Sequence, residues 1–280
     1  MHWFADIMAA LGVVLNGIPQ GIMAMGLGFA VFPTTFSFLL VSGINLAFSS
    51  VAPVSFQAES LALTGNLGKN TREYTSIIFG GSIIMLIIGL TGTLTRIVQV
   101  FGNHIITGMM AGVGIMLAKI ALNMSKGHGW TGWDSIAAAV ITYLISKDLV
   151  WTICLSVILS SLFAVFVEHY QNELPQNVTV RRFIFTKPLF NLRILRGALG
   201  LACLNIGANL SYGIKPNPVN LNLLTSSQAL ADMGTSLLGG APVETIISAT
   251  ASAPEPVIAG VLMMLIMAVI LFVGWLPKIG

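Results

Sequence analysis

The chain has 280 residues, of which 55% are hydrophobic and only 8% are charged, and its formal net charge is +3. A soluble domain usually carries about 25% charged residues, so this composition excludes a water-soluble globular protein. The basic residues form no stripe of the kind that binds phosphate backbones, which argues against a nucleic-acid partner.

The beginning of the chain predicts two membrane crossings. No charged residue occurs between Asp6 and Glu59, a run of 52 positions. A helix rises about 1.5 Å per residue and needs about 20 residues to cross a bilayer. The run therefore predicts helices at 4–25 and 27–48. Gly17 and Gly21 lie one turn apart in the first, which favours close packing within one subunit, with a homodimer interface as the alternative.

Further apolar segments follow, at 50–64, 75–95, 103–123, 134–146, 148–168, 194–213, 226–239, 241–252 and 255–276. Four of these, 50–64, 134–146, 226–239 and 241–252, are too short to cross as continuous helices. Half-length helices occur in membranes only where protein or a watery cavity surrounds them, and they are typical of the midplane site of a transporter. We expect a multi-pass protein integral to the plasma (inner) membrane.

Positive charges are distributed unevenly between the loops. If the segments alternate in direction, nine lysines and arginines lie on one side, against Arg96 and Lys147 on the other. Five of the nine fall in the linker at 169–196. The positive-inside rule then places the nine on the cytoplasmic side and the N-terminus outside.

Two of the short segments are similar to each other. Ala52-Pro53-Val54 opens one and Ala241-Pro242-Val243 opens the other, each after small residues and each shortly before a carboxylate. Transporters are often built from inverted repeats whose broken helices meet at the middle of the membrane. We therefore interpret the two segments as equivalent parts of an internal repeat.

Glu59 and Glu244 are the principal candidates for a substrate-binding or coupling role. An acid at membrane depth costs about 2.5–3.5 kcal/mol even on lenient scales, so each is a candidate proton carrier or substrate acceptor. The alternative is a place near a headgroup interface or a simple polar pairing. A proline fits the first turn of a helix, and the helix that begins there points free N–H groups at its start. Neutral hydrogen bonds are expected from Gln57, Ser55 and Thr245.

Asn205 and Asn209 lie four residues apart on one helix face. This amide pair suits a planar, hydrogen-bonding solute, and it equally suits contact between helices. Asp232 is expected to cap or neutralise locally rather than to bind substrate. No metal-ligand spacing and no catalytic motif such as HExxH, GxSxG or a P-loop occurs. We expect a non-enzyme that needs no cofactor.

The stretch Ala-Asp-Met-Gly-Thr-Ser-Leu-Leu-Gly-Gly-Ala-Pro at 231–242 and the ending Gly-Trp-Leu-Pro-Lys-Ile-Gly at 274–280 resemble the xanthine/uracil permease family, the nucleobase–cation symporter-2 group. Ile18-Pro19-Gln20-Gly21 resembles the first span of the sulfate permease family, which shares the architecture. The resemblance implies an all-α polytopic membrane protein with fourteen segments in two inverted sevens and short extended stretches in segments 3 and 10. About eleven of these segments are recognised here.

The resemblance also implies a division into domains and a site. Residues 1–100 and 194–280 correspond to a core domain, 101–170 to part of a gate domain, and 171–193 to a basic linker. Family members place the N-terminus in the cytoplasm, contrary to the charge count. The family's substrate-binding acids fall at Leu204 or Asn205 and at Ser248, and neither position is acidic here. Glu244 lies one helical turn before Ser248.

These observations favour a secondary active transporter of a nucleobase-like or other small polar solute, coupled to H+ or Na+. One alternative is an anion transporter like the sulfate permeases, because helix N-termini suit anions. Another is a partial permease that does not transport.

Overall fold

The computed structural model describes residues 2–94, 96, 129–147, 149–166, 183–212, 220–246 and 249–276, with scattered positions between 108 and 126. Most of the fifth expected segment, 103–123, falls outside these residues, as do 171–182 of the expected linker and 277–280 of the C-terminal motif.

The helices are α1 (His2–Gly26), α2 (Val31–Ala47), α3 (Ala58–Leu67), α4 (Thr71–Leu90), α6 (Gly129–Ser146), α7 (Leu149–Phe166), α8 (Leu192–Tyr212), α9 (Leu221–Ser236) and α10 (Pro256–Val273). Two short strands, β1 (Val54–Ser55) and β2 (Glu244–Thr245), and a 3-10 helix, η1 (Ala249–Ser252), complete the described elements.

Local sequence explains several helix ends. The side-chain oxygen of Asn70 accepts a hydrogen bond from the Glu73 N–H (3.0 Å) at the start of α4, and Asn220 does the same for Leu223 (3.1 Å) at α9. These bonds satisfy N–H groups that a helix start leaves free. Helix α10 begins at a proline and ends at Gly274, whose φ of +71° is a left-handed conformation that favours glycine.

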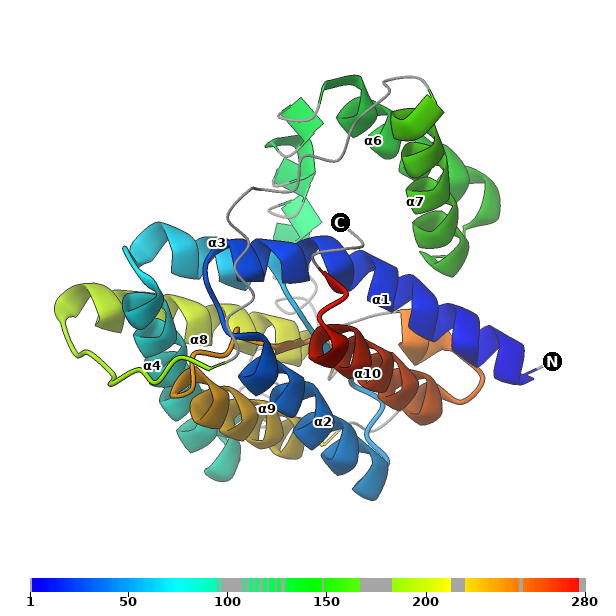
Figure 1. Cartoon of the computed structure of the whole chain (residues 1–280). Helices are drawn as coiled ribbons and strands as arrows, with labels where there is room; N and C mark the ends of the chain where they lie inside the picture. The colour runs from blue at the N-terminus through cyan, green and yellow to red at the C-terminus, as the bar shows by residue number, and fades with distance from the viewer. Residues whose placement is uncertain are drawn as a thin grey trace.

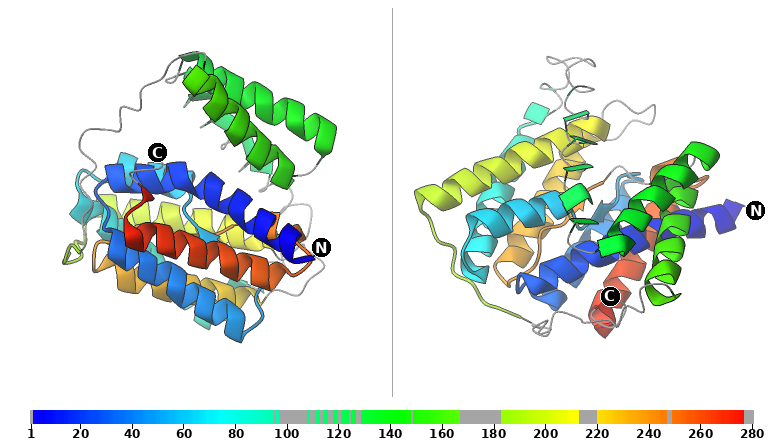
Figure 2. Two further views of the ribbon diagram at one scale, coloured as in Figure 1. Left: turned by 45° about the vertical axis from the view of Figure 1, so that its right-hand side comes forward. Right: turned by 90° about the horizontal axis from the view of Figure 1, so that it is seen from above.

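Helices from both ends of the chain pack together into one body (Figure 1). Helix α4 packs on α8 and α9, α10 packs on α2 and α1, and α2 also contacts α9. Helices α6 and α7 pack on each other and lie to one side, where α7 contacts α1. A view turned by 45° shows the same separation of the α6–α7 pair from the other helices (Figure 2, left). Segments far apart in sequence therefore share one interior.

The interior and the outside of this body are both apolar. Large side chains such as Phe38, Ile77 and Met263 are completely buried. Others on the same helices are more than half exposed, including Phe36 (55%), Ile87 (58%) and Phe272 (61%). Helices α1, α2, α4 and α10 are long and apolar enough to cross a membrane by length and composition. An apolar exterior on such helices suits contact with lipid.

The four expected short segments differ from the structure. In the third, expected at 50–64, helix α3 spans Ala58–Leu67 and does not begin at Pro53. Helix α6 begins at Gly129 and has 18 residues, so it is longer than the expected 134–146. Helix α9 begins at Leu221 instead of 226, because Asn220 caps it there. The tenth segment was expected to hold a half-length helix, and this is wrong for its described residues: it contains β2 and the four-residue η1. Its β-branched residues Val243, Thr245 and Ile246 favour extended backbone.

Residues 183–191, which we call the strap, form neither helix nor strand and lead into α8. The N–H groups of Ile184 and Thr186 donate to the carbonyls of Leu238 and Leu237, both at 3.0 Å. Farther along, the Leu189 N–H donates to Ser76 Oγ of α4 at 2.9 Å. The described part of the expected linker is therefore fixed to α4 and to the end of α9.

The glycine pair in α1 makes close contacts within the subunit, as expected. A Cβ atom at Gly17 would lie 2.7 Å from Met267 Cε, and one at Gly21 would lie 3.0 Å from Phe56 Cε2. Glycine at these positions lets α1 approach α10 and the segment that contains β1.

Candidate functional site

The two Ala-Pro-Val segments meet in a short antiparallel ribbon. Strands β1 and β2 pair Val54 with Thr245 and Ser55 with Glu244, and all four residues are buried. One more bond extends the pairing, from the Ile246 N–H to the Pro53 carbonyl (3.0 Å). Proline has no N–H to donate, so Pro53 and Pro242 limit how far the ribbon continues.

Side chains of α2 satisfy the backbone beside the ribbon. Asn45 Nδ2 donates to the Ala52 carbonyl at 2.7 Å, and the Ala241 N–H donates to Thr34 Oγ1 at 2.9 Å. A buried backbone group without a partner is costly. These two bonds allow both segments to leave regular helix in the interior.

Glu244 lies at the centre of the polar groups and is only 1% exposed. The hydroxyl of Ser60 on α3 donates to its Oε1. In the amide orientation that gives both groups a partner, Asn205 of α8 donates to both carboxylate oxygens at 2.8 Å. Three segments of the chain thus converge on one carboxyl group.

Glu59 lies in the first turn of α3, next to Ser60, and is 8% exposed. Its carboxylate interacts with its own backbone N–H. With its amide nitrogen turned toward Glu59, Gln57 donates to the two carboxylate oxygens at 2.6 and 3.2 Å; in the other orientation it donates to the Thr245 carbonyl at 3.4 Å. Ser60, which follows Glu59 in the chain, donates to Glu244, so the two acids lie in the same part of the interior.

Helix α9 holds the far side of the ribbon through two residues one turn apart. Asp232 Oδ1 accepts from the Val243 N–H at 3.0 Å, which is the local capping role expected from sequence. Gln228 Oε1 accepts from both the N–H (3.3 Å) and the hydroxyl (2.8 Å) of Thr245. Asp232 also acts electrostatically on Glu244.

The other candidate residues separate into different places. Asn209 Nδ2 donates to Thr225 Oγ1 of α9 at 3.1 Å, so it joins two helices and does not contact Glu244. Ser55 lies against α1, where its Oγ would be 3.1 Å from a Cβ atom at Gly17. Ser248 lies outside the described residues. Of the two asparagines, only Asn205 contacts the acid.

The site therefore combines buried carboxyl groups with neutral hydrogen-bond donors. Among the described residues, Arg193 and Glu73 form an ion pair at 3.7 Å. None of the three buried acids Glu59, Asp232 and Glu244 takes part in it. The site can accept cations or protons at its carboxyl groups, and α3 adds a helix N-terminus.

Sequence reasoning missed Ser60 and Gln228. Ser60 follows Glu59 directly, and Gln228 lies four residues before Asp232 on one helix face. That spacing was the available signal for Gln228. A serine in an apolar helix is too common to mark a contact with a residue 184 positions away.

Comparison with known proteins supports the fold. No family model matches the chain, and no curated protein matches it. Among solved structures it is similar to the transmembrane domain of a cyanobacterial bicarbonate transporter, BicA, with a TM-score of 0.65 and 11% sequence identity, over 100% of this chain and 84% of that one. The chain thus has the fold of an all-α polytopic membrane protein.

Proposed function

We propose that the chain is a secondary active transporter that carries a small anion together with a cation. The observation that carries this proposal is the buried ribbon between the two proline-led segments, which joins Glu244, Ser60 and Asn205. The chain shares its fold with a bicarbonate transporter's transmembrane domain, and this likeness supports a transport role.

The cost of the polar site is a further argument for function. Glu244, Asp232 and Asn205 are all at most 5% exposed, inside a body of apolar helices. Burial of such groups disfavours folding unless each one is hydrogen-bonded, and ionisable residues within a membrane generally mark solute or ion pathways. Asp232 has a structural partner in the Val243 N–H, whereas a purely structural ribbon would need neither Glu244 nor the neighbouring Glu59.

The nature of the solute is inferred from what the site offers. Acids at the positions of Asn205 and Ser248 would fit the nucleobase family, and this chain has neutral residues there. Neutral donors and the N-terminus of α3 suit an oxyanion better than acids do. The anion expectation drawn from the sulfate permeases also agrees better with a likeness to a bicarbonate transporter.

The three carboxyl groups require a cation for anion transport. Glu59 and Asp232 both act electrostatically on Glu244, and in the described part of the chain no basic side chain pairs with any of them. An anion placed beside ionised carboxylates would be repelled. A proton or Na+ that enters first removes this repulsion, which makes coupled transport the natural cycle.

For the moving parts, we propose the division already expected from sequence. Residues 1–100 and 194–280 form the core that holds the site, and 101–170 contribute to the gate. The α6–α7 pair contacts the core through α7 and α1. Transporters of this kind alternate access by moving one such body against another.

The test is uptake by the purified full chain in proteoliposomes under an imposed proton or sodium gradient. Labelled sulfate, small carboxylates, uracil and xanthine are the substrates, each measured in turn, and unlabelled bicarbonate and uracil are the competitors. We expect anion uptake that an ionophore abolishes. Bicarbonate should compete with the labelled anion for uptake, and uracil should not. Uptake of uracil or xanthine would return the chain to the nucleobase hypothesis. Correctly folded protein that moves none of these solutes would support a partial permease and overturn the proposal.

A further inference from the structure

The outer surface of the strap has the composition of a membrane interface. Phe183, Phe185 and Phe190 are 51%, 87% and 78% exposed, and the exposed Lys187 lies between them. Exposed aromatic rings next to basic side chains are typical of the boundary between lipid tails and headgroups. We therefore place this end of the body at the headgroup level of one leaflet.

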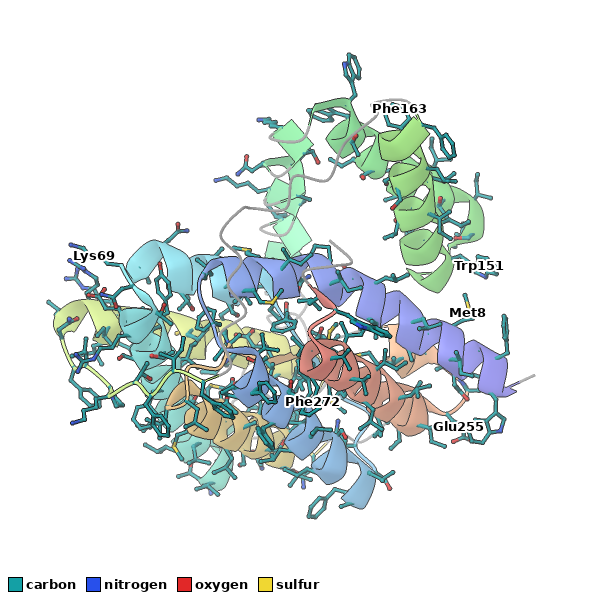
Figure 3. All side chains as sticks on the ribbon, viewed as in Figure 1. Met8, Lys69, Trp151, Phe163, Glu255 and Phe272 are labelled. Atoms are coloured by element: carbon teal, nitrogen blue, oxygen red, sulfur yellow. The ribbon has the colours of Figure 1, made fainter. Side chains whose placement is uncertain are left out.

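The same end of the body is strongly basic. The described stretches 69–73 and 183–196 contain five basic residues and one acid, Glu73. The basic residues are Lys69, Arg72, Lys187, Arg193 and Arg196, and all five are exposed. Figure 3 shows Lys69 at this end and Glu255 at the other, where the Glu255 N–H donates to the buried Asp6. Such a charge cluster attracts anionic headgroups.

Two hollows are lined in part by strap residues. One, of ≈ 540 Å³, is lined by Asn70, Thr71, Arg72 and Lys187 together with Ile184, Phe185 and Thr186. The other, of ≈ 430 Å³, lies between α4 and α8 and is lined almost entirely by apolar groups: Gly80, Ile83, Ile84, Phe190, Ile194, Leu195 and Ala198, with Asn191. The first suits a phosphate and the second suits a hydrocarbon chain.

We propose that this surface binds one anionic phospholipid, with its phosphate beside Arg72 and Lys187 and an acyl chain in the groove between α4 and α8. Arg72 and Gly80 are eight residues apart on α4, or about 12 Å along the helix axis, which a single acyl chain spans. A soluble anion would leave the groove unfilled. A neutral lipid would leave the basic hollow without a partner.

The proposal is tested by titrating lipid into the purified full chain in neutral detergent. Phosphatidylglycerol is compared with phosphatidylcholine of the same acyl chains, and the readouts are the thermal shift and bound lipid in native mass spectrometry. We expect a clear rise in unfolding temperature with phosphatidylglycerol alone. Lys187→Gln should weaken its binding about fivefold, the effect of removing one charge near an anionic surface.

Matched variants separate this site from general membrane affinity. Lys147→Gln removes a charge four residues before Trp151, which Figure 3 shows far from Lys69. It should leave binding unchanged. Leu195→Trp narrows the groove and should weaken binding, whereas Leu46→Trp changes a similarly exposed leucine on α2 and should not.

Three results would overturn the proposal: equal binding of the two lipids, equal effects of Lys187→Gln and Lys147→Gln, or binding of soluble glycerol phosphate as tight as that of the lipid. None of them depends on which solute the chain transports, since no uptake is measured.

Discussion

After Pro53 the chain pairs for two residues and then enters α3, a helix of ten residues; after Pro242 it pairs in the same ribbon but continues into a four-residue 3-10 helix. The first acid, Glu59, therefore lies in a helical turn beyond the ribbon. The second, Glu244, lies in the strand itself. Their exposed fractions are 8% and 1%.

This difference shows that the shared tripeptide and the residues after it have separate effects. The prolines lie in the stretches that follow the ends of α2 and α9, and the two segments pair directly after them. The residues beyond each tripeptide decide the local structure: Ala58, Leu61 and Ala62 are strong helix formers, while Thr245 and Ile246 are β-branched. Strand β2 holds Glu244 at the centre of the site, and helix α3 holds Glu59 at its edge.

The largest effect is expected when Glu244 is changed to glutamine. Ser60 and Asn205 both donate to this carboxyl group, and a hydrogen bond to a charged group contributes about 1.5–3 kcal/mol. Uptake of the transported anion should fall about 100-fold. Glu59→Gln, with Gln57 as its side-chain partner, should reduce uptake only about tenfold.

The two variants are compared by their initial uptake rates per amount of reconstituted protein. Their unfolding temperatures serve as the control for correct folding. If Glu59→Gln proved the more damaging change, the assignment of centre and edge would be reversed. Rates unaffected by either change would remove both acids from the mechanism.

A second comparison concerns the two asparagines of α8. Asn205→Leu removes the amide that contacts Glu244, so uptake should fall about tenfold. Asn209→Leu removes a bond to Thr225, and Asn209 Oδ1 has no partner among the described residues, so uptake should stay within about twofold. Uptake by both variants is measured in the same proteoliposome assay. Equal losses would show that α8 acts through its packing and not through the acid.

The sequence predicted the framework of the fold well because charge-free runs follow directly from the cost of placing charge in lipid. Helices α1, α2, α4 and α10 fall where such runs occur. The start of α6 was missed because Gly129, Gly132 and Asp134 interrupt the apolar pattern there, and the start of α9 because Asn220 and Asn222 made it look like a loop. At α9 the Asn220 cap decided the helix start.

The site was predictable only in part. A carboxylate inside an apolar segment is rare, so Glu59 and Glu244 stood out, and the repeated Ala-Pro-Val indicated that their segments meet. Ser60 and Gln228 are neutral residues whose partners lie far away in sequence. The separate roles of Asn205 and Asn209 depend on how α8 is rotated against α9, which a four-residue spacing does not fix.

A smaller effect is expected at Gly239, which precedes the second Ala-Pro-Val. Its φ is +85°, and an added Cβ would lie 3.0 Å from the Ile184 carbonyl oxygen in the strap. Gly239→Ala should destabilise the protein by about 2 kcal/mol, from the left-handed backbone and the contact together. Gly274→Ala is the matched control, because its φ is +71° but no atom lies within 4 Å of the added Cβ. It should lower the unfolding temperature by about half as much.

The smallest effect is expected at Ser49, a serine with the left-handed backbone conformation that glycine usually provides. Ser49 follows the C-cap of α2 with a φ of +51°, and the next N–H, of Ser50, donates back to the Asn45 carbonyl at 2.9 Å. This is the left-handed helix ending that glycine normally provides. Ser49→Gly removes a backbone cost of about 1–2 kcal/mol but gives the unfolded chain more freedom, so a net stabilisation of about 0.5 kcal/mol should remain. The measurement is the unfolding temperature in detergent, beside that of Gly239→Ala. A decrease in the unfolding temperature for Ser49→Gly would mean that the serine hydroxyl makes a contact that stabilises the protein by more than the backbone strain costs. The turns before the two Ala-Pro-Val segments would then be stabilised in different ways.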